Sequence, residues 1–222
     1  MNRRKGILIG LLLAGLFVCA GAFPLKTRQG VNYQVTTHPI PLAVKGLEFA
    51  IRDIRLRQLA AEITCGLNTE EARAAALFNW TQKQIRHTPP GWPVIDDHIT
   101  HIIIRGYGET DQMADVFTTL STYAGLPAFW RTARSKSRKC TLILSFVRMN
   151  GRWTVWDVAH GGAYRTEQGS LASVEDLAKG SDLEGLLPLE VPETLRAEKQ
   201  MLGRRVAFEL RRGWRSILGL LR

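Results

Sequence analysis

Residues 108–128 read GETDQMADVFTTLSTYAGLPA, and this stretch decides the fold. Its apolar residues recur at i, i+3, i+4, i+7, i+10 and i+11, which is the spacing of one buried face of an α-helix. Gly125 and Pro127 end the pattern, because glycine favours the left-handed conformation after a helix and proline cannot continue one. The stretch therefore predicts a helix between Gly108 and Gly125. Its apolar face consists of Met113, Val116, Phe117, Leu120, Tyr123 and Ala124.

The residues that follow predict a sheet beside this helix. A strand is expected over residues 128–132, and apolar runs at 141–149 and 152–158 lie on either side of Asn150-Gly151. Asn-Gly between two such runs is a strong hairpin signal, because both residues tolerate the positive φ angles of a two-residue turn. The sequence thus predicts an α+β fold, with helices packed on a small antiparallel sheet.

Further helices are expected upstream. Residues 45–65 carry apolar side chains at helical spacing. Asn68, with Glu71 three residues later, has the pattern of a capping box, which predicts that a second helix begins there. Three consecutive isoleucines at 102–104 are expected to form a strand.

This order of elements resembles the transglutaminase-like superfamily, whose members have a papain-like core. In that family a helix begins with a Gly-x-Cys motif and ends in Gly-Ile/Leu-Pro-Ala. Two adjacent strands around an Asn/Asp-Gly-x-Trp turn then carry a histidine and an aspartate. Here Gly108-Glu109-Thr110 opens the helix, residues 124–128 close it, and Asn150-Gly151-Arg152-Trp153 forms the turn. The resemblance covers roughly residues 65–160 and includes the upstream helix with Trp80.

The resemblance places the family's catalytic cysteine, histidine and aspartate on Thr110, Leu142 and Asp157. The family's chemistry uses a thiolate, stabilised by a helix N-terminus and a nearby histidine that an aspartate orients. In the predicted hairpin Leu144 lies opposite Asp157, and Leu142 is a diagonal neighbour on the same face. A threonine hydroxyl is scarcely ionised at neutral pH, and leucine accepts no proton. The sequence therefore predicts a pseudoenzyme with no intact catalytic set.

Two alternatives stay open. One is an active acyl transferase or amide/peptide hydrolase, in which His101 or His160 activates Thr110 from a direction that the family pattern does not predict. The other is a metal site formed by Asp96-Asp97-His98 with His101. No cysteine or glutamate completes that set, so a polar loop is the simpler interpretation, and no metal or cofactor is predicted.

The charge of the chain lies mainly at its ends. The formal net charge is +10, of which residues 3–5 contribute +3 and residues 198–222 contribute +5. A domain that binds nucleic acid usually carries its charge on the folded body, so no nucleic-acid partner is predicted. This distribution favours a membrane surface instead.

The N-terminus has the pattern of a signal sequence. Arg3, Arg4 and Lys5 precede an unbroken apolar run from Gly6 to Phe23. Residues 1–24 are therefore predicted to be a signal peptide or a retained signal anchor, and both remain open. In either case the positive-inside rule exports the rest of the chain, which would be periplasmic or secreted, or anchored to the membrane.

The C-terminus is predicted to form a basic amphipathic helix over residues 198–222. On a helical projection the apolar residues from Leu202 onward gather on one side and the arginines on the other. This pattern is typical of a helix that lies in a membrane interface, although a helix packed on its own domain is an alternative. The residues expected to contact the membrane surface are Arg204, Arg205, Arg211, Arg212, Trp214 and Arg215.

Between these ends, residues 25–44 are predicted to be a linker and residues 45–197 a transglutaminase-like domain. An oxidising compartment would permit a disulfide between Cys65 and Cys140. We expect a non-catalytic protein of the cell envelope with a binding or scaffolding role toward an unknown protein, peptide or envelope polymer.

Overall fold

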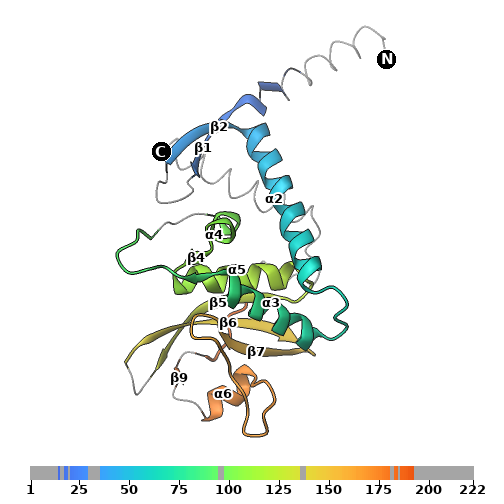
Figure 1. The fold of residues 1–222 in the computed structure, drawn as a ribbon, viewed down its shortest axis with the longest axis vertical. Coiled ribbons are helices and arrows are strands. Elements are labelled where there is room, and N and C mark those ends of the chain that lie inside the picture. The colour runs from blue at the N-terminus through green and yellow to red at the C-terminus, as the bar shows by residue number, and fades with distance from the viewer. Residues whose placement is uncertain are drawn as a thin grey trace.

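The computed structural model describes residues 15, 18–19, 21–29, 36–94, 98–135, 139–180, 183–184 and 186–192. In these residues helices cover one face of a central antiparallel sheet, and a smaller helix lies on the other face (Figure 1). The α+β fold class predicted from the sequence is confirmed. The residues expected to form the C-terminal amphipathic helix lie outside the described part of the chain.

The sheet has five strands in the order β8-β7-β6-β5-β9, and all neighbouring strands are antiparallel. Its three long strands are the predicted ones, although β5 extends beyond the expected residues 128–132. The strands are β5 Ala128–Ser135, β6 Thr141–Met149, β7 Arg152–Asp157, β8 Gly162–Ala163 and β9 Leu183–Glu184.

The β6–β7 hairpin has the predicted two-residue turn. Asn150 and Gly151 have φ angles of 49° and 79°, which the tight turn requires. The resulting register pairs Ser145 with Trp156. This is the register expected from the Asn-Gly signal, so the prediction is confirmed.

The two faces of the sheet pack against different elements. Helix α5 (Thr110–Tyr123) contributes Val116, Phe117 and Leu120 to a core that also contains Val147 of β6 and Trp156 of β7. A second cluster on the opposite face joins alternate residues of the same strands to α6 (Val174–Gly180). Its buried members are Phe129, Ala133, Leu144, Phe146, Val155, Ala172, Val174, Leu177 and Leu186.

Helix α2 is anchored to α5 by a buried carboxylate. The Tyr123 hydroxyl donates to Asp53 Oδ1 at 2.8 Å, and Arg57 Nη2 donates to Asp53 Oδ2 at 3.1 Å. Asp53 is 8% exposed. The remaining helices and short strands on this side of the sheet are α2 Leu42–Ile63, α3 Glu70–Gln84, α4 Ile99–Arg105, β3 Arg86–His87 and β4 Tyr107–Gly108.

Residues 25–44, which were predicted to be a linker, contain regular secondary structure. They contain most of a β-hairpin, β1 Pro24–Gln29 and β2 Thr36–Pro41, and α2 begins directly after it. Pro24 pairs with Pro41 at the open end of the hairpin, where a two-stranded sheet has free edges that tolerate a missing N–H.

Two helix predictions also need correction. The isoleucines at 102–104 lie in α4, a helix that ends at Gly106 with a φ angle of 74°. A run this short has no periodicity that distinguishes strand from helix. Helix α3 is capped by Thr69 rather than by Asn68, because the Thr69 hydroxyl accepts the Ala72 N–H at 3.1 Å.

No helix in the described residues is long and apolar enough to cross a membrane, and most of residues 1–24 lie outside that part.

Candidate functional site

Thr110 is the first residue of α5, at the N-terminus of the helix that crosses the sheet. The chain approaches it through Gly108, where an added Cβ would lie 3.0 Å from Cβ and Oε1 of Gln112. Glycine at 108 therefore lets the backbone pass against the first turn of the helix. The Thr110 side chain is only partly buried.

Side-chain oxygens accept two backbone N–H groups at this helix N-terminus, those of Glu109 and Gln112. Glu109 is the N-cap and forms a capping box with Gln112, whose Oε1 accepts the Glu109 N–H at 3.0 Å. Asp111 Oδ1 accepts the Gln112 N–H at 2.9 Å. A helix N-terminus ordinarily favours an anion, because its N–H groups and dipole are unopposed. Here two carboxylates of the chain itself, Glu109 and Asp111, already occupy the positive end.

Asp115 adds a third carboxylate one turn further along α5. Burial raises its pKa, the indole N–H of Trp130 lowers it, and the charge of Asp111 raises it again. The Trp130 Nε1 donates to Asp115 Oδ1 at 3.2 Å. The first two turns of α5 therefore carry three carboxyl groups, those of Glu109, Asp111 and Asp115.

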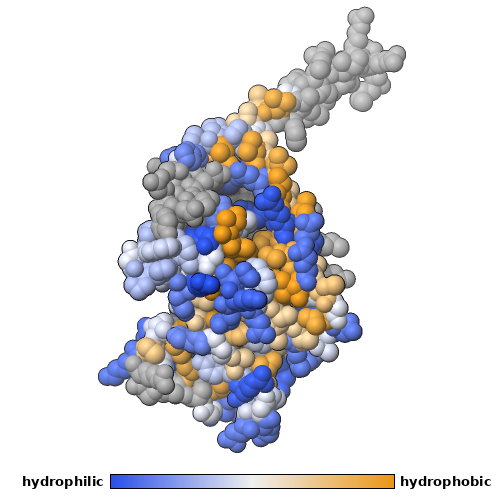
Figure 2. Space-filling model, in the orientation of Figure 1, coloured by the Kyte–Doolittle hydropathy of each residue, from blue (hydrophilic) through white to orange (hydrophobic). Residues whose placement is uncertain are grey.

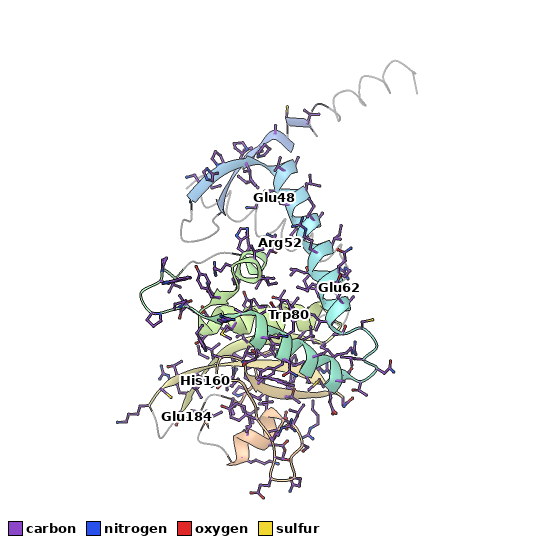
Figure 3. The ribbon with its side chains drawn as sticks, viewed as in Figure 1. Glu48, Arg52, Glu62, Trp80, His160 and Glu184 are labelled. Atoms are coloured by element: carbon purple, nitrogen blue, oxygen red, sulfur yellow. The ribbon has the colours of Figure 1, made fainter. Side chains whose placement is uncertain are left out.

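Asp157, the last residue of β7, holds a histidine. Its carboxylate accepts from His160 Nδ1, at 2.9 Å to each oxygen, and its Oδ1 accepts the His160 backbone N–H at 3.1 Å. The Asp157 side chain is 12% exposed and that of His160 is 67% exposed (Figure 3). The imidazole is thus oriented by a nearly buried carboxylate and presented to solvent.

Strand β3 connects this histidine turn to the start of α5. The His87 Nε2–H donates to the Ala159 carbonyl at 2.8 Å, while the backbone of His87 pairs with Gly108. The amide of Gln82, at the end of α3, donates to the Val158 carbonyl. The structure therefore brings together the neighbourhoods of Thr110 and Asp157 through His87.

The Thr110 hydroxyl has no histidine base within hydrogen-bonding distance. No hydrogen bond among the described residues joins it to an imidazole. His101, the other candidate, lies on α4 with its ring 6.1 Å from that of His98. The arrangement has an oriented imidazole and a helix-terminal hydroxyl without a proton-transfer contact between them.

Comparison with known proteins identifies the domain. A family model described as the transglutaminase-like superfamily matches residues 57–158. This part of the chain is a transglutaminase-like domain. No curated protein matched the chain.

Solved structures with a similar arrangement share little sequence with the chain. A proposed cysteine protease from Cytophaga hutchinsonii is 15% identical, with a TM-score of 0.44, over 59% of this chain and 45% of the other. LapG from Legionella pneumophila is 12% identical, with a TM-score of 0.39, over 55% of this chain and 79% of the other. A proposed protease from Parabacteroides distasonis is 11% identical, with a TM-score of 0.39, over 61% of this chain and 36% of the other. The chain thus spans less than half the length of the Cytophaga hutchinsonii and Parabacteroides distasonis proteins.

Leu142, which the resemblance was expected to place at the family's histidine position, is not part of the core that contains α5. It packs against the cluster on the α6 face of the sheet, to which its β6 neighbours Leu144 and Phe146 belong. The carboxylate of Asp157 instead binds a histidine three residues further along the chain. The signal for this pairing is the Asp-x-x-His spacing before Gly161, which follows the end of a predicted strand.

The remaining site predictions concern metals and thiols. Asp96 and Asp97 lie outside the described residues, and within the described ones no three His, Cys, Asp or Glu side chains form a metal-binding group. Cys65 and Cys140 are free thiols and do not form the disulfide considered above. Four tryptophans of the domain have structural contacts: Trp156 is buried, Trp80 and Trp153 pack against the two cores, and Trp130 binds Asp115.

Proposed function

We propose that this transglutaminase-like domain is non-catalytic and serves as a binding or scaffolding module in the cell envelope. The observation that supports this proposal is the N-terminus of α5. Thr110 stands at the family's cysteine position, and Glu109 and Asp111 supply negative charge there. Acyl transfer develops negative charge on the nucleophile and on the carbonyl oxygen, and both would be repelled by these carboxylates.

The cellular setting of the proposal follows from the ends of the sequence. The basic residues before an apolar run favour export, and the run itself favours attachment to the membrane. The arginines and Trp214 of residues 198–222 would add contacts with anionic lipid, each arginine contributing roughly 1 kcal/mol. A module held at the membrane in this way is suited to recruiting a protein, peptide or envelope polymer.

Activity assays on the full chain in detergent test the non-catalytic proposal. Two reactions are measured: ammonia release from a glutamine-containing peptide in the presence of a primary amine, and cleavage of a fluorogenic peptide library. We expect no turnover above that of Thr110→Ala. The matched control is Thr119→Ala, a substitution elsewhere on α5. Turnover shared by wild type and Thr119→Ala, and lost in Thr110→Ala, would overturn the proposal.

Photo-crosslinking in cells tests the binding role. A photoreactive residue replaces exposed His160, and Glu167, which is also exposed, serves as the control position. We expect a defined crosslinked product from position 160 and none from position 167. Equal labelling from both positions would show that this end of the sheet is not the binding surface.

The alternative function is an acyl transferase or amide hydrolase, and the Asp157–His160 pair is the observation that favours it. A histidine oriented by a carboxylate is the usual form of a general base, and such contacts often tighten when substrate binds. In this mechanism His160 would accept the Thr110 proton as the hydroxyl attacks an amide carbonyl carbon, and would then give that proton to the leaving amine as the C–N bond breaks. If the chain is an enzyme of this kind, the turnover measured in the assays above must be lost in both His160→Ala and Thr110→Ala.

A further inference from the structure

Helix α2 carries an apolar stripe that the domain does not cover. Val44, Leu47, Ile51 and Ile54 are 43%, 61%, 42% and 55% exposed. Large apolar side chains scattered singly on a surface are ordinary, but four on one line of one helix are not. Figure 2 shows hydrophobic side chains along the edge of the molecule where Figure 1 places α2.

The stripe has the spacing of a coiled-coil seam. Its residues are separated by three, four and three positions, so they occupy the a and d positions of successive heptads. Gln58 and Ala61, both exposed, continue the series to the end of the helix.

The same helix buries its opposite side against the domain. That buried side consists of Asp53, Leu56 and Ala60. At 100° per residue these lie across the helix from the stripe. Helix α2 therefore has two opposite faces with apolar residues, and the domain packs on only one of them.

We propose that this stripe, Val44, Leu47, Ile51 and Ile54, pairs with the same stripe of a second copy of the chain in a parallel two-stranded coiled coil. β-Branched residues at a with leucine at d favour two strands, and Val44, Ile51 and Leu47 follow that rule. A lipid-facing helix has a wider apolar face and a predominantly basic polar face. Here the e residues beside the stripe are Glu48, Arg55 and Glu62, so two of the three charges next to it are acidic. Figure 3 labels Glu48 and Glu62 on this helix.

The charges beside the stripe permit the parallel register. In a parallel pair each g residue lies near the e residue five positions later in the partner helix. Arg57, whose guanidinium binds Asp53 of its own chain, would lie near Glu62 of the partner subunit, which is an oppositely charged neighbour. Ala50 and Ala43, the other g residues, are small and uncharged, so no like charges meet.

The structure leaves room for this pairing. Because the stripe lies opposite the face that packs on the domain, the two domains of the dimer would lie outside the helix pair. The Leu42 N–H donates to the Phe23 carbonyl at 2.9 Å, which fixes the start of α2 beside the end of the N-terminal apolar run. A parallel pair puts both runs at the same end, as anchorage in one membrane requires. The pairing itself does not depend on the proposed binding function.

Cysteine crosslinking of the full chain in membranes tests the proposal. The background carries Cys19→Ser, Cys65→Ser and Cys140→Ser, and oxidation is catalysed by copper phenanthroline. Leu47→Cys and Ile54→Cys are each expected to give a disulfide-linked dimer, because d residues of a parallel pair face each other. Arg52→Cys, on the same helix but off the stripe, is the control and should remain monomeric.

Other occupants of the stripe give different results. A dimer that forms only when Leu47→Cys and Ile51→Cys chains are mixed would establish an antiparallel pair, in which a residues face d residues, and would overturn the parallel one. Monomers whose introduced thiols resist a water-soluble maleimide would assign the stripe to lipid or to residues 198–222, and would overturn the dimer.

A second measurement guards against misfolding of the cysteine variants. The dimer fraction of the full chain in detergent is measured by light scattering for Ile51→Asp and for Lys45→Asp. We expect Ile51→Asp to weaken dimerisation by about 100-fold or more, since each dimer loses two buried isoleucines. Lys45→Asp should change it little. An equal effect of the two substitutions, with unchanged circular dichroism, would contradict the proposal.

Discussion

Replacing Tyr123 by phenylalanine removes a single hydrogen bond that joins α2 to α5. The Tyr123 hydroxyl donates to Asp53 Oδ1 at 2.8 Å, and Asp53 is 8% exposed. The aromatic ring stays in place for Arg57, whose guanidinium carbon lies 5.6 Å from the ring centre. The substitution thus isolates the hydroxyl and keeps the packing.

The expected loss of stability follows from the chemistry of the bond. A hydrogen bond to a charged group contributes about 1.5–3 kcal/mol. Asp53 keeps its contact with Arg57 at 3.1 Å, so we expect the lower part of that range, about 1.5 kcal/mol. For a domain of this size each kcal/mol lowers Tm by about 2–4 °C. The variant should therefore melt about 3–6 °C below wild type.

Thermal and urea unfolding, followed by circular dichroism, measure the effect. Asp53→Asn and the double variant complete a thermodynamic cycle, in which we expect a coupling free energy above about 0.5 kcal/mol. A Tyr123→Phe variant as stable as wild type, with effects that simply add in the double variant, would refute this account of how α2 is attached.

Three further predictions concern α5 and α6. Burial raises the pKa of Asp115 in the folded state, so its charged form lowers stability once pH exceeds the unfolded value. Asp115→Asn should therefore raise urea resistance at pH 7, by an amount that shrinks as pH falls toward about 4, whereas a pH-independent gain would contradict the assignment. Gly108→Ala should cost about 1–3 kcal/mol in urea unfolding because the new Cβ meets Gln112, while Gly46→Ala, which meets nothing within 4 Å, should not destabilise. The backbone N–H and hydroxyl of Ser173 lower the pKa of Asp176. Asp176→Asn should lower the urea midpoint at neutral pH, with the difference disappearing as pH falls below about 4, where wild type loses the same interaction.

The parts of the fold that the sequence predicted are those with strong local signals. The Asn150-Gly151 turn sets the register of two strands, and the apolar spacing between Met113 and Ala124 defines α5. The β1–β2 hairpin was missed because its prolines suppress the strand pattern, and β8 and β9 are two-residue strands that depend on tertiary pairing. Strands as short as β8 and β9 form because neighbouring strands supply hydrogen-bond partners, and those partners cannot be recognised from the local sequence pattern.

The candidate site was predictable only at the level of positions. Thr110 lies at the start of α5 and Asp157 at the end of β7, where the family pattern places them. The pattern also directed attention to Leu142, whereas the imidazole that Asp157 binds belongs to His160. The turn after β7 brings the His160 imidazole back to the Asp157 carboxylate. The backbone of this turn is held by hydrogen bonds from Gln82 and His87, which are more than 70 residues away in the chain.

The sheet ends on both sides in strands of two residues, β8 and β9. A long free edge strand acts as a template on which another chain can add its own backbone, and this is how aggregation begins. The short edges here leave few unpaired backbone groups for such growth. Many copies of this domain could therefore crowd at high local density without polymerising through their sheets.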